Sequence, residues 1–166
     1  MLSADNQQES LDAEWIVGFV DGEGCFHVAI NKQPKMKIGW QVLPEFRIVQ
    51  HKRDIKILYK IRNTLGIGQI TRNHGDRFEV RIRGLENLKK LINFFQEHNL
   101  QTTKKENFGI FCKIIDLMEQ KEHLTQEGLN KIALLASSMN NRVKSKYLES
   151  SETICRTSNY DNSMKI

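Results

Sequence analysis

Residues 15–24, with the sequence WIVGFVDGEG, are the stretch that decides the fold. On a helix Gly18 and Gly22 lie four residues apart on one face, where the backbone of a second helix can approach closely. The glycines at the end stop the helix, and Glu23 lies at that stop with a carboxylate suited to a hard divalent cation. A DGEG sequence alone is more often a turn, and it has neither the ligand spacing of a calcium loop nor the preceding strand of a phosphate-binding loop. The surrounding sequence is therefore needed to assign a function to this stretch.

Helix-like and strand-like periodicities follow one another along the chain. The first helix begins at a cap formed by Ser10 or Asp12 and ends at the glycines of VDGEG. The pattern predicts strands at 25–32, 39–52, 68–73 and 77–84, and further helices at 54–65, 85–97, 105–120 and 126–139. Pro44 falls inside the second strand, which predicts an edge position or a bulge there. The order is α-β-β-α-β-β-α followed by helices, an α+β arrangement that predicts a four-stranded antiparallel sheet with one apolar face under its helices and one polar face open to solvent.

The composition is that of an ordinary globular protein. The chain has 166 residues, of which 39% are hydrophobic and 27% charged, and this suits one domain with a proper core. We expect a flexible segment at 1–12, the domain at 13–147 and a polar tail at 148–166. No apolar run reaches the ~20 residues of a membrane span and the start lacks the basic region of a signal peptide, so we expect no membrane partner. Three widely spaced cysteines predict neither a disulfide framework nor a zinc site and favour a reducing compartment.

The charge is unevenly distributed along the chain. The net charge is +5, yet residues 1–23 hold six acids and no Lys or Arg, so the remainder carries 25 bases against 14 acids. Residues 32–83 alone hold 13 bases and four acids, which is typical of a surface that binds phosphates. Nucleic acid is therefore the leading partner, although surplus lysine could also serve only to keep a surface soluble.

The polar face of the predicted sheet is the expected contact surface for double-stranded DNA. A two-stranded ribbon fits the major groove, where amide, basic and acidic side chains recognise base edges. The alternative is a merely solvated sheet face, although such faces usually mix both signs of charge. The candidate base-contacting residues are Asn31, Gln33, Gln41, Glu45, Arg47, Thr71, Asn73, Arg77, Glu79 and Arg81. In the tail, the candidates for phosphate contacts, or else for simple solvation, are Arg142, Lys144 and Lys146.

With these surroundings, residues 16–24 resemble the LAGLIDADG motif. The residues that fit the motif are Ile16, Gly18, Phe19, Val20, Asp21 and Gly24, with Gly22 at the small position and Glu23 in place of the last Asp. The predicted element order is also the fold of that family. From about Trp15 to Lys146 the chain is thus similar to a single-motif LAGLIDADG homing endonuclease, which cleaves long, specific sites in double-stranded DNA.

The resemblance implies a metal-dependent hydrolase in which two motif helices pack together and each presents its last acid to the scissile phosphates. Here that acid is Glu23, with Gly22 beside it as a further metal ligand. We find no second copy of the motif, so the family pattern implies a homodimer and a nearly palindromic target. The expected interface residues are Gly18, Phe19, Asp21 and Gly22. The implied cofactor is Mg²⁺, about two or three ions per dimer, with Ca²⁺ supporting binding without cleavage.

Two more catalytic positions follow from the family pattern. Gln50, at the end of the second strand, would position the attacking water, and Lys104, before a late helix, would stabilise charge on the phosphate. Lys105 competes with Lys104 for this role. A basic residue that some relatives place after the glutamine aligns with Asp54, so Arg53 or Lys52 takes its role or it is absent. The alternative interpretation is purely structural: Gln50 would be an ordinary residue at a strand end, and Lys104 a solvated residue at a helix start.

Two other functions are compatible with the same sequence features. One is an RNA-binding maturase that assists splicing of its host intron, and the other is a DNA-binding repressor without catalysis. The intact acid at Glu23 argues against a maturase, and a repressor would leave Mg²⁺ without a role. Family members are often encoded by organelle introns, so we expect a mitochondrial or, alternatively, a chloroplast protein, although a cytosolic protein would have the same sequence features.

Overall fold

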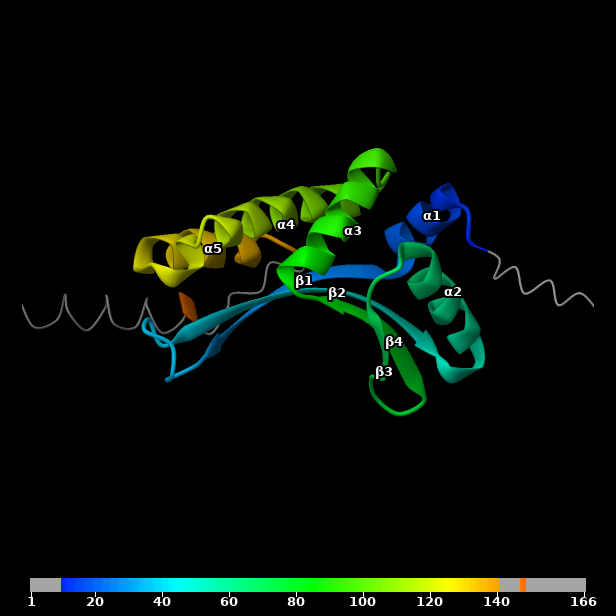
Figure 1. Cartoon of the computed structure of the whole chain (residues 1–166), viewed down its shortest axis with the longest axis horizontal. Helices are drawn as coiled ribbons and strands as arrows, with labels where there is room; N and C mark the ends of the chain where they lie inside the picture. Colours follow the sequence, from blue (N-terminus) through cyan, green and yellow to red (C-terminus); the bar gives the residue numbers. More distant parts are fainter. Residues whose placement is uncertain (1–9, 141–146, 149–166) are drawn as a thin grey trace, which may run out of the picture. The chain divides into compact units, whose positions relative to one another are not determined.

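The structure, a computed structural model, describes residues 10–140 and 147–148. Its elements are α1 (Ala13–Glu23), β1 (Gly24–Lys32), β2 (Trp40–His51), α2 (Ile55–Leu65), β3 (Gln69–Arg72), β4 (Arg77–Arg83), α3 (Leu85–Glu97), α4 (Lys104–Glu119) and α5 (Gln126–Ser137), with short 3₁₀ turns at Lys52–Asp54 and Glu122–Leu124 (Figure 1). The four strands form one sheet in the order β1-β2-β4-β3. The predicted α+β fold with a four-stranded antiparallel sheet and additional C-terminal helices is confirmed.

The chain divides into two compact units. Unit 1 contains Met1–Cys25 and Phe46–Lys105, and unit 2 contains Phe26–Glu45 and Glu106–Ile166. Both units have a core of fully buried apolar side chains. Within the described residues, the core of unit 1 includes Ile16, Val20, Phe46, Ile48, Leu58, Ile61, Val80, Ile82, Leu88, Leu91 and Phe95, and that of unit 2 includes Phe26, Phe111, Ile114, Leu129 and Ile132.

Helix α1 has a well-defined start and a crowded end. The Asp12 carboxylate accepts hydrogen bonds from the backbone N–H groups of Glu14 and Trp15, at 2.9 and 3.2 Å, and so caps the helix as predicted. At the other end the chain passes directly into β1 at Gly24. A Cβ atom on Gly24 would lie 2.7 Å from Val20 Cγ1 and 2.9 Å from the Val20 carbonyl oxygen. Only glycine lets the helix turn into the strand this closely, which accounts for the last glycine of the stretch.

The β3–β4 hairpin carries two different faces. In its register Ile70 lies opposite Val80 and Thr71 lies opposite Glu79. Val80 and the following apolar position, Ile82, are buried, and both α2 and α3 contact β4. In Figure 1 the helices α1, α2 and α3 lie on the upper side of the strands of unit 1. The alternation of apolar and polar residues thus sends one set to the helices and the other to the opposite face.

Unit 2 is organised around aromatic packing. The ring of Phe26 lies 5.4 Å from Phe108 and 5.3 Å from Phe111, and all three side chains are buried. The Asn140 side-chain amide donates to the carbonyl oxygen of Phe26 at 3.0 Å. Gly128 allows the first turn of α5 to touch the preceding turn, since a Cβ there would lie 2.1 Å from the Glu122 carbonyl oxygen.

Pro44 lies in β2, which has 12 residues and stands between β1 and β4 in the sheet order. Strand β4 has only seven residues and can pair with just part of β2. The expected edge-like position or bulge at Pro44 stays a prediction. Among the described residues, no helix has the length and apolar character needed to cross a membrane.

Candidate functional site

The end of α1 exposes Glu23. It is the last residue of the helix and is exposed, while Gly24 directly after it is buried. The buried strand start therefore fixes the backbone on one side of Glu23, and its carboxylate faces solvent. This is the position that the sequence predicts for a metal-binding acid.

One stripe of α1 is largely open within the described chain, and its residue Phe19 is half-buried. Trp15, Gly18, Phe19 and Gly22 follow the helical spacing i, i+3, i+4, i+7. Cβ atoms built on Gly18 and Gly22 meet nothing within 4 Å, and Trp15 is 42% exposed and stacks on Phe19 with ring centroids 5.0 Å apart. A flat aromatic pair beside two bare backbone positions is suited to close packing against a second helix.

Asp21 turns its carboxylate toward its own chain. One oxygen accepts from the backbone N–H of Gln101 at 2.9 Å, and the other accepts from the Thr102 hydroxyl at 2.8 Å and the Thr102 N–H at 3.2 Å. Burial raises the pKa of Asp21, but these hydrogen bonds and the charge of Lys104 outweigh it, and the net pKa lies below its ordinary value. The carboxylate is therefore occupied within the chain, and the expected interface contact of Asp21 stays a prediction.

Lys104 is brought to the end of the motif. It is the first residue of α4, its backbone N–H donates to the Thr102 hydroxyl at 3.3 Å, and its ammonium Nζ donates to the carbonyl oxygen of Gly24. Its positive charge is thus held one residue beyond Glu23. Lys105 is exposed, and its backbone N–H donates to the Thr102 carbonyl at 2.9 Å. Of the two competing lysines, Lys104 is the one whose side chain binds the motif.

Two residues that the motif does not predict hold Asp21 in place. Gln101 and Thr102 lie in the turn before α4 and both donate to Asp21, and the Thr102 hydroxyl also connects Asp21 to Lys104. A threonine two residues before a helix start is a usable signal, because Thr side chains commonly accept from backbone N–H groups there. Its partner Asp21 could not be found in this way, since it lies 81 residues away.

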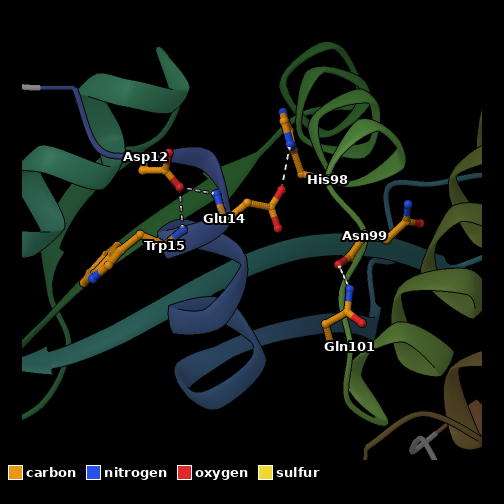
Figure 2. A network of polar contacts seen from close by, with 6 residues as sticks. All are labelled: Asp12, Glu14, Trp15, His98, Asn99 and Gln101. Carbon is orange, nitrogen blue, oxygen red and sulfur yellow. Dashed lines mark hydrogen bonds and ion pairs between the residues drawn. The ribbon is translucent and has the colours of Figure 1, made fainter.

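The start of α1 is tied to the end of α3 beside this site. The Glu14 carboxylate lies 3.2 Å from His98 Nδ1, and the Gln101 side-chain amide donates to the Asn99 carbonyl at 2.8 Å. Figure 2 shows Glu14 pointing toward His98 while Trp15 points away from it. The Glu14 side chain is 72% exposed, so this contact contributes little to stability.

Gln50 lies in a separate pocket of about 600 Å³. Among the described residues, no hydrogen bond joins Gln50 to Glu23 or Lys104. The pocket does connect Gln50 with the basic side chains that follow it and with Phe19 of the α1 stripe. Its lining residues are Phe19, Gln50, Arg53, Asp54, Lys56, Ile57 and Lys60. Asp54 occupies the position at which some relatives have a basic residue. Its carboxylate accepts a hydrogen bond from Arg53 Nε at 3.2 Å and so binds the neighbouring basic side chain.

Oxygen donors at the end of α1 fit a hard cation. Glu23 offers an exposed carboxylate, and the preceding residue, Gly22, offers a backbone carbonyl. Mg²⁺ prefers such ligands and is usually held by one or two carboxylates together with water and phosphate oxygens. Within residues 10–140 and 147–148, no three His, Cys, Asp or Glu side chains gather around one point.

The polar sheet face is only partly open to solvent. In unit 1, Asn73 and Arg77 are exposed and Arg47, Thr71 and Arg81 are half-buried. Of the predicted base-contacting residues in unit 2, Asn31 is exposed, and Gln33 and Gln41 are half-buried. Arg142 and Lys144, like Lys146, lie outside the described residues.

Two acids contradict the expected solvent-open face. Glu45 is 6% exposed and Glu79 is 0% exposed. For Glu79 the reason is direct contact, because its carboxylate binds Arg81, Asn73 and Thr71. A buried carboxylate that is engaged by its neighbours cannot also contact a base in this arrangement.

Comparison with known proteins gives one family. A family model described as LAGLIDADG endonuclease matches residues 16–115. A Neurospora crassa protein named probable intron-encoded endonuclease 3 is 36% identical over 126 residues, which are 74% of this chain and 24% of that protein. The chain therefore spans about a quarter of the length of this curated relative. Other relatives are named as proteins of an ND4 intron of Podospora anserina and a cox1 intron of Schizosaccharomyces pombe.

Two solved structures are similar over most of the chain. The crystal structure of the homing endonuclease I-TnaI is 49% identical with a TM-score of 0.83, covering 88% of this chain and 99% of that chain. I-SmaMI, bound to an uncleaved DNA target in the presence of calcium ions, is 36% identical with a TM-score of 0.82, covering 87% of this chain and 49% of that chain.

Proposed function

Because this chain belongs to the LAGLIDADG endonuclease family, we propose that it is a homing endonuclease that cleaves a long, specific site in double-stranded DNA. The observation that carries the proposal is the end of α1, where the exposed acid Glu23 lies next to Gly24, the carbonyl of which binds the Lys104 ammonium. A carboxylate that can bind a cation and an ammonium group that can stabilise negative charge are both suited to phosphodiester hydrolysis, and here both lie at the end of α1.

The active form in this proposal is a homodimer. One chain supplies one Glu23, and cutting both strands requires two such sites. The largely open stripe of Trp15, Gly18, Phe19 and Gly22 would form the contact between two α1 helices. A two-fold dimer in turn requires a nearly palindromic target.

The proposed cofactor is Mg²⁺, held by the Glu23 carboxylate and the Gly22 carbonyl of each chain together with DNA phosphates. When bound, the ion supplies Lewis acidity that lowers the pKa of a coordinated water and offsets phosphate charge. I-SmaMI was bound to an uncleaved DNA target in the presence of calcium ions, which supports a role for a divalent cation in this proposal.

In the proposed mechanism the chain's own residues orient the reactants. The water oxygen attacks phosphorus and the bond to the leaving sugar oxygen breaks, without a covalent enzyme intermediate. The Lys104 ammonium stabilises the negative charge that builds on the phosphate, and the Asp21–Thr102 contact holds Lys104 in place. Gln50, with Arg53 beside it in their pocket, would orient the water or the neighbouring phosphate.

The polar sheet face is the proposed DNA contact. In unit 1 the exposed or half-buried residues Arg47, Thr71, Asn73, Arg77 and Arg81 are the proposed base-contacting set, with Asn31, Gln33 and Gln41 in unit 2. Two relatives are named for introns of ND4 and cox1 genes, which supports an organelle and, more narrowly, a mitochondrial location.

The test is cleavage of a DNA library that contains randomised near-palindromic sites. We expect cutting with Mg²⁺, none with EDTA, and binding without cutting with Ca²⁺. Glu23→Gln should bind the selected site but cleave it at least about a hundredfold more slowly, because a carboxylate ligand is lost. Glu97→Gln removes an exposed acid from the end of α3 and is the matched control, with wild-type cleavage expected. Binding by the wild type without any cutting would refute the nuclease and leave a DNA-binding or RNA-binding protein.

A further inference from the structure

The β3–β4 hairpin contains a buried acid on the face that is otherwise turned to solvent. Glu79 is 0% exposed, although Asn73 and Arg77 on the same face are exposed. Burying a carboxylate is costly unless it is paired and hydrogen-bonded, and an apolar residue often serves stability equally well at such a site. The acid at this position therefore needs another explanation than stability.

Three neighbouring side chains satisfy Glu79. Arg81 Nη2 lies 2.5 Å from Oε1, the Thr71 hydroxyl lies 3.3 Å from the same oxygen, and Asn73 Nδ2 lies 2.7 Å from Oε2. Thr71 is the direct cross-strand partner of Glu79, and Arg81 lies two residues along the strand on the same face. We call these four residues the Glu79 cluster.

The chemistry of Glu79 fixes which atoms its neighbours turn outward. A carboxylate paired with a guanidinium only accepts hydrogen bonds, so Thr71 must use its hydroxyl hydrogen and Asn73 its NH₂ group toward Glu79. Thr71 is left with oxygen lone pairs, whereas Asn73 gives one of its two amide hydrogens to the acid and keeps its carbonyl oxygen Oδ1 and its second N–H for other partners. In isolation the Thr71 hydroxyl and the Asn73 amide could turn either way, and the buried acid fixes Thr71 as an acceptor and leaves Oδ1 of Asn73 as the outward acceptor.

From this we propose that Glu79 determines sequence specificity as a positioning residue, by fixing the hydroxyl oxygen of Thr71 and the carbonyl oxygen of Asn73 as the acceptors turned toward DNA. In the major groove the donors on base edges are the amino groups, N4 of cytosine and N6 of adenine, whereas guanine and thymine present oxygen there. The hairpin therefore selects amino bases over keto bases at the positions that Thr71 and Asn73 contact. The inference rests on the proposed function and replaces the expectation that Glu79 itself contacts a base.

The experiment measures binding of the library-selected DNA duplex in Ca²⁺, with each base pair of a half-site replaced in turn by the other three. For the wild type we expect one or two positions at which adenine or cytosine is preferred about tenfold over guanine and thymine. Glu79→Gln introduces an amide that can donate as well as accept, so Asn73 can reverse its amide. We expect the preference at those positions alone to fall to about twofold. Glu97→Gln removes the same charge from an exposed site and should keep the wild-type profile.

Two further variants decide the matter if thermal unfolding shows that Glu79→Gln does not fold. Thr71→Val and Asn73→Ala each remove one proposed acceptor, and each should abolish the amino-base preference at one position, whereas Thr71→Ser should retain it. Profiles of Glu79→Gln, or of both acceptor variants, that superimpose on the wild-type profile would overturn the inference alone. A wild-type protein without sequence-specific binding would overturn the proposed function and the inference with it.

Discussion

The Asp21 carboxylate and the Thr102 hydroxyl are joined by a 2.8 Å hydrogen bond, and the same hydroxyl accepts from the backbone N–H of Lys104. Lys104 in turn donates from Nζ to the carbonyl of Gly24. Residues 21–24 and 101–104 are thus connected at both ends, with Glu23 between the two attachments. These hydrogen bonds therefore hold Glu23 of the motif and Lys104 of a distant segment in one rigid frame.

Asp21→Asn should slow cleavage far more than it weakens DNA binding. Its side-chain NH₂ would face N–H donors of residues 101 and 102, and the loss of these exposed hydrogen bonds to a charged acceptor should cost about 1 kcal/mol of stability. We expect a lower midpoint in urea, a kcat reduced about tenfold or more and a dissociation constant in Ca²⁺ within about threefold of wild type. Asp116→Asn, an exposed acid on α4, is the control. A wild-type kcat for Asp21→Asn would show that the frame does not position Lys104.

Gly18→Ala should stabilise the single chain and weaken the dimer. Its Cβ meets nothing within 4 Å in one chain, and replacing glycine by alanine inside a helix gains about 0.5–1 kcal/mol. In the proposed dimer the same methyl group would separate two closely packed backbones. Sedimentation velocity at several concentrations should show dissociation, while Gly109→Ala, an equally open helical glycine on α4, should stay dimeric. Unchanged dimerisation of Gly18→Ala would place the interface elsewhere.

Gly24→Ala should destabilise unit 1 by about 1–3 kcal/mol, because its methyl group would overlap Val20 and crowd Phe46. A Cβ there would lie 2.7 Å from Val20 Cγ1 and 3.2 Å from a ring carbon of Phe46. The double variant Gly24→Ala with Val20→Ala removes the main overlap and should recover part of the loss. Urea unfolding of the three proteins tests this, and a Gly24→Ala variant as stable as the wild type would contradict it.

Cys112 should resist alkylation up to unusually high pH. Burial, helped by the neighbouring charge of Asp116, raises the pKa of the Cys112 thiol to about 11. At pH 8 only about one thiol in a thousand is then the reactive thiolate, and the alkylation rate should rise about tenfold per pH unit up to that pKa. Peptide mapping after iodoacetamide treatment measures the rate. In urea the same thiol should level off near pH 9, and a folded rate that levels off there too would refute the shifted pKa.

Local periodicity was sufficient for most of the fold. The helix predicted at 85–97 has those bounds in the structure, and the helix predicted at 54–65 begins at Ile55 after a 3₁₀ turn. These segments bury one face each, so the spacing of their apolar residues carries the information. The order of the strands in the sheet could not be predicted in this way, because it depends on pairing between distant segments, which each strand's own residues do not encode.

The candidate site was predictable only in part. Glu23 and Lys104 could be identified from the motif and its resemblance to a family, and the contact of Lys104 with Gly24 favours it over Lys105. Glu79 was assigned to an open face because alternation gives the side of a strand and not the depth of burial. Its burial arises from Thr71, Asn73 and Arg81, which come from both strands of the hairpin.

The sequence by itself determined the order of helices and strands, the glycine-lined stripe of α1 and the acid at its end, because these features depend on neighbours within a few residues. Tertiary structure alone decided that Asp21 binds a turn 81 residues away and that Glu79 organises its neighbours. The physical reason is the same in both cases. A carboxylate is bound by whichever donors folding brings within about 3 Å, and those donors come from separate segments.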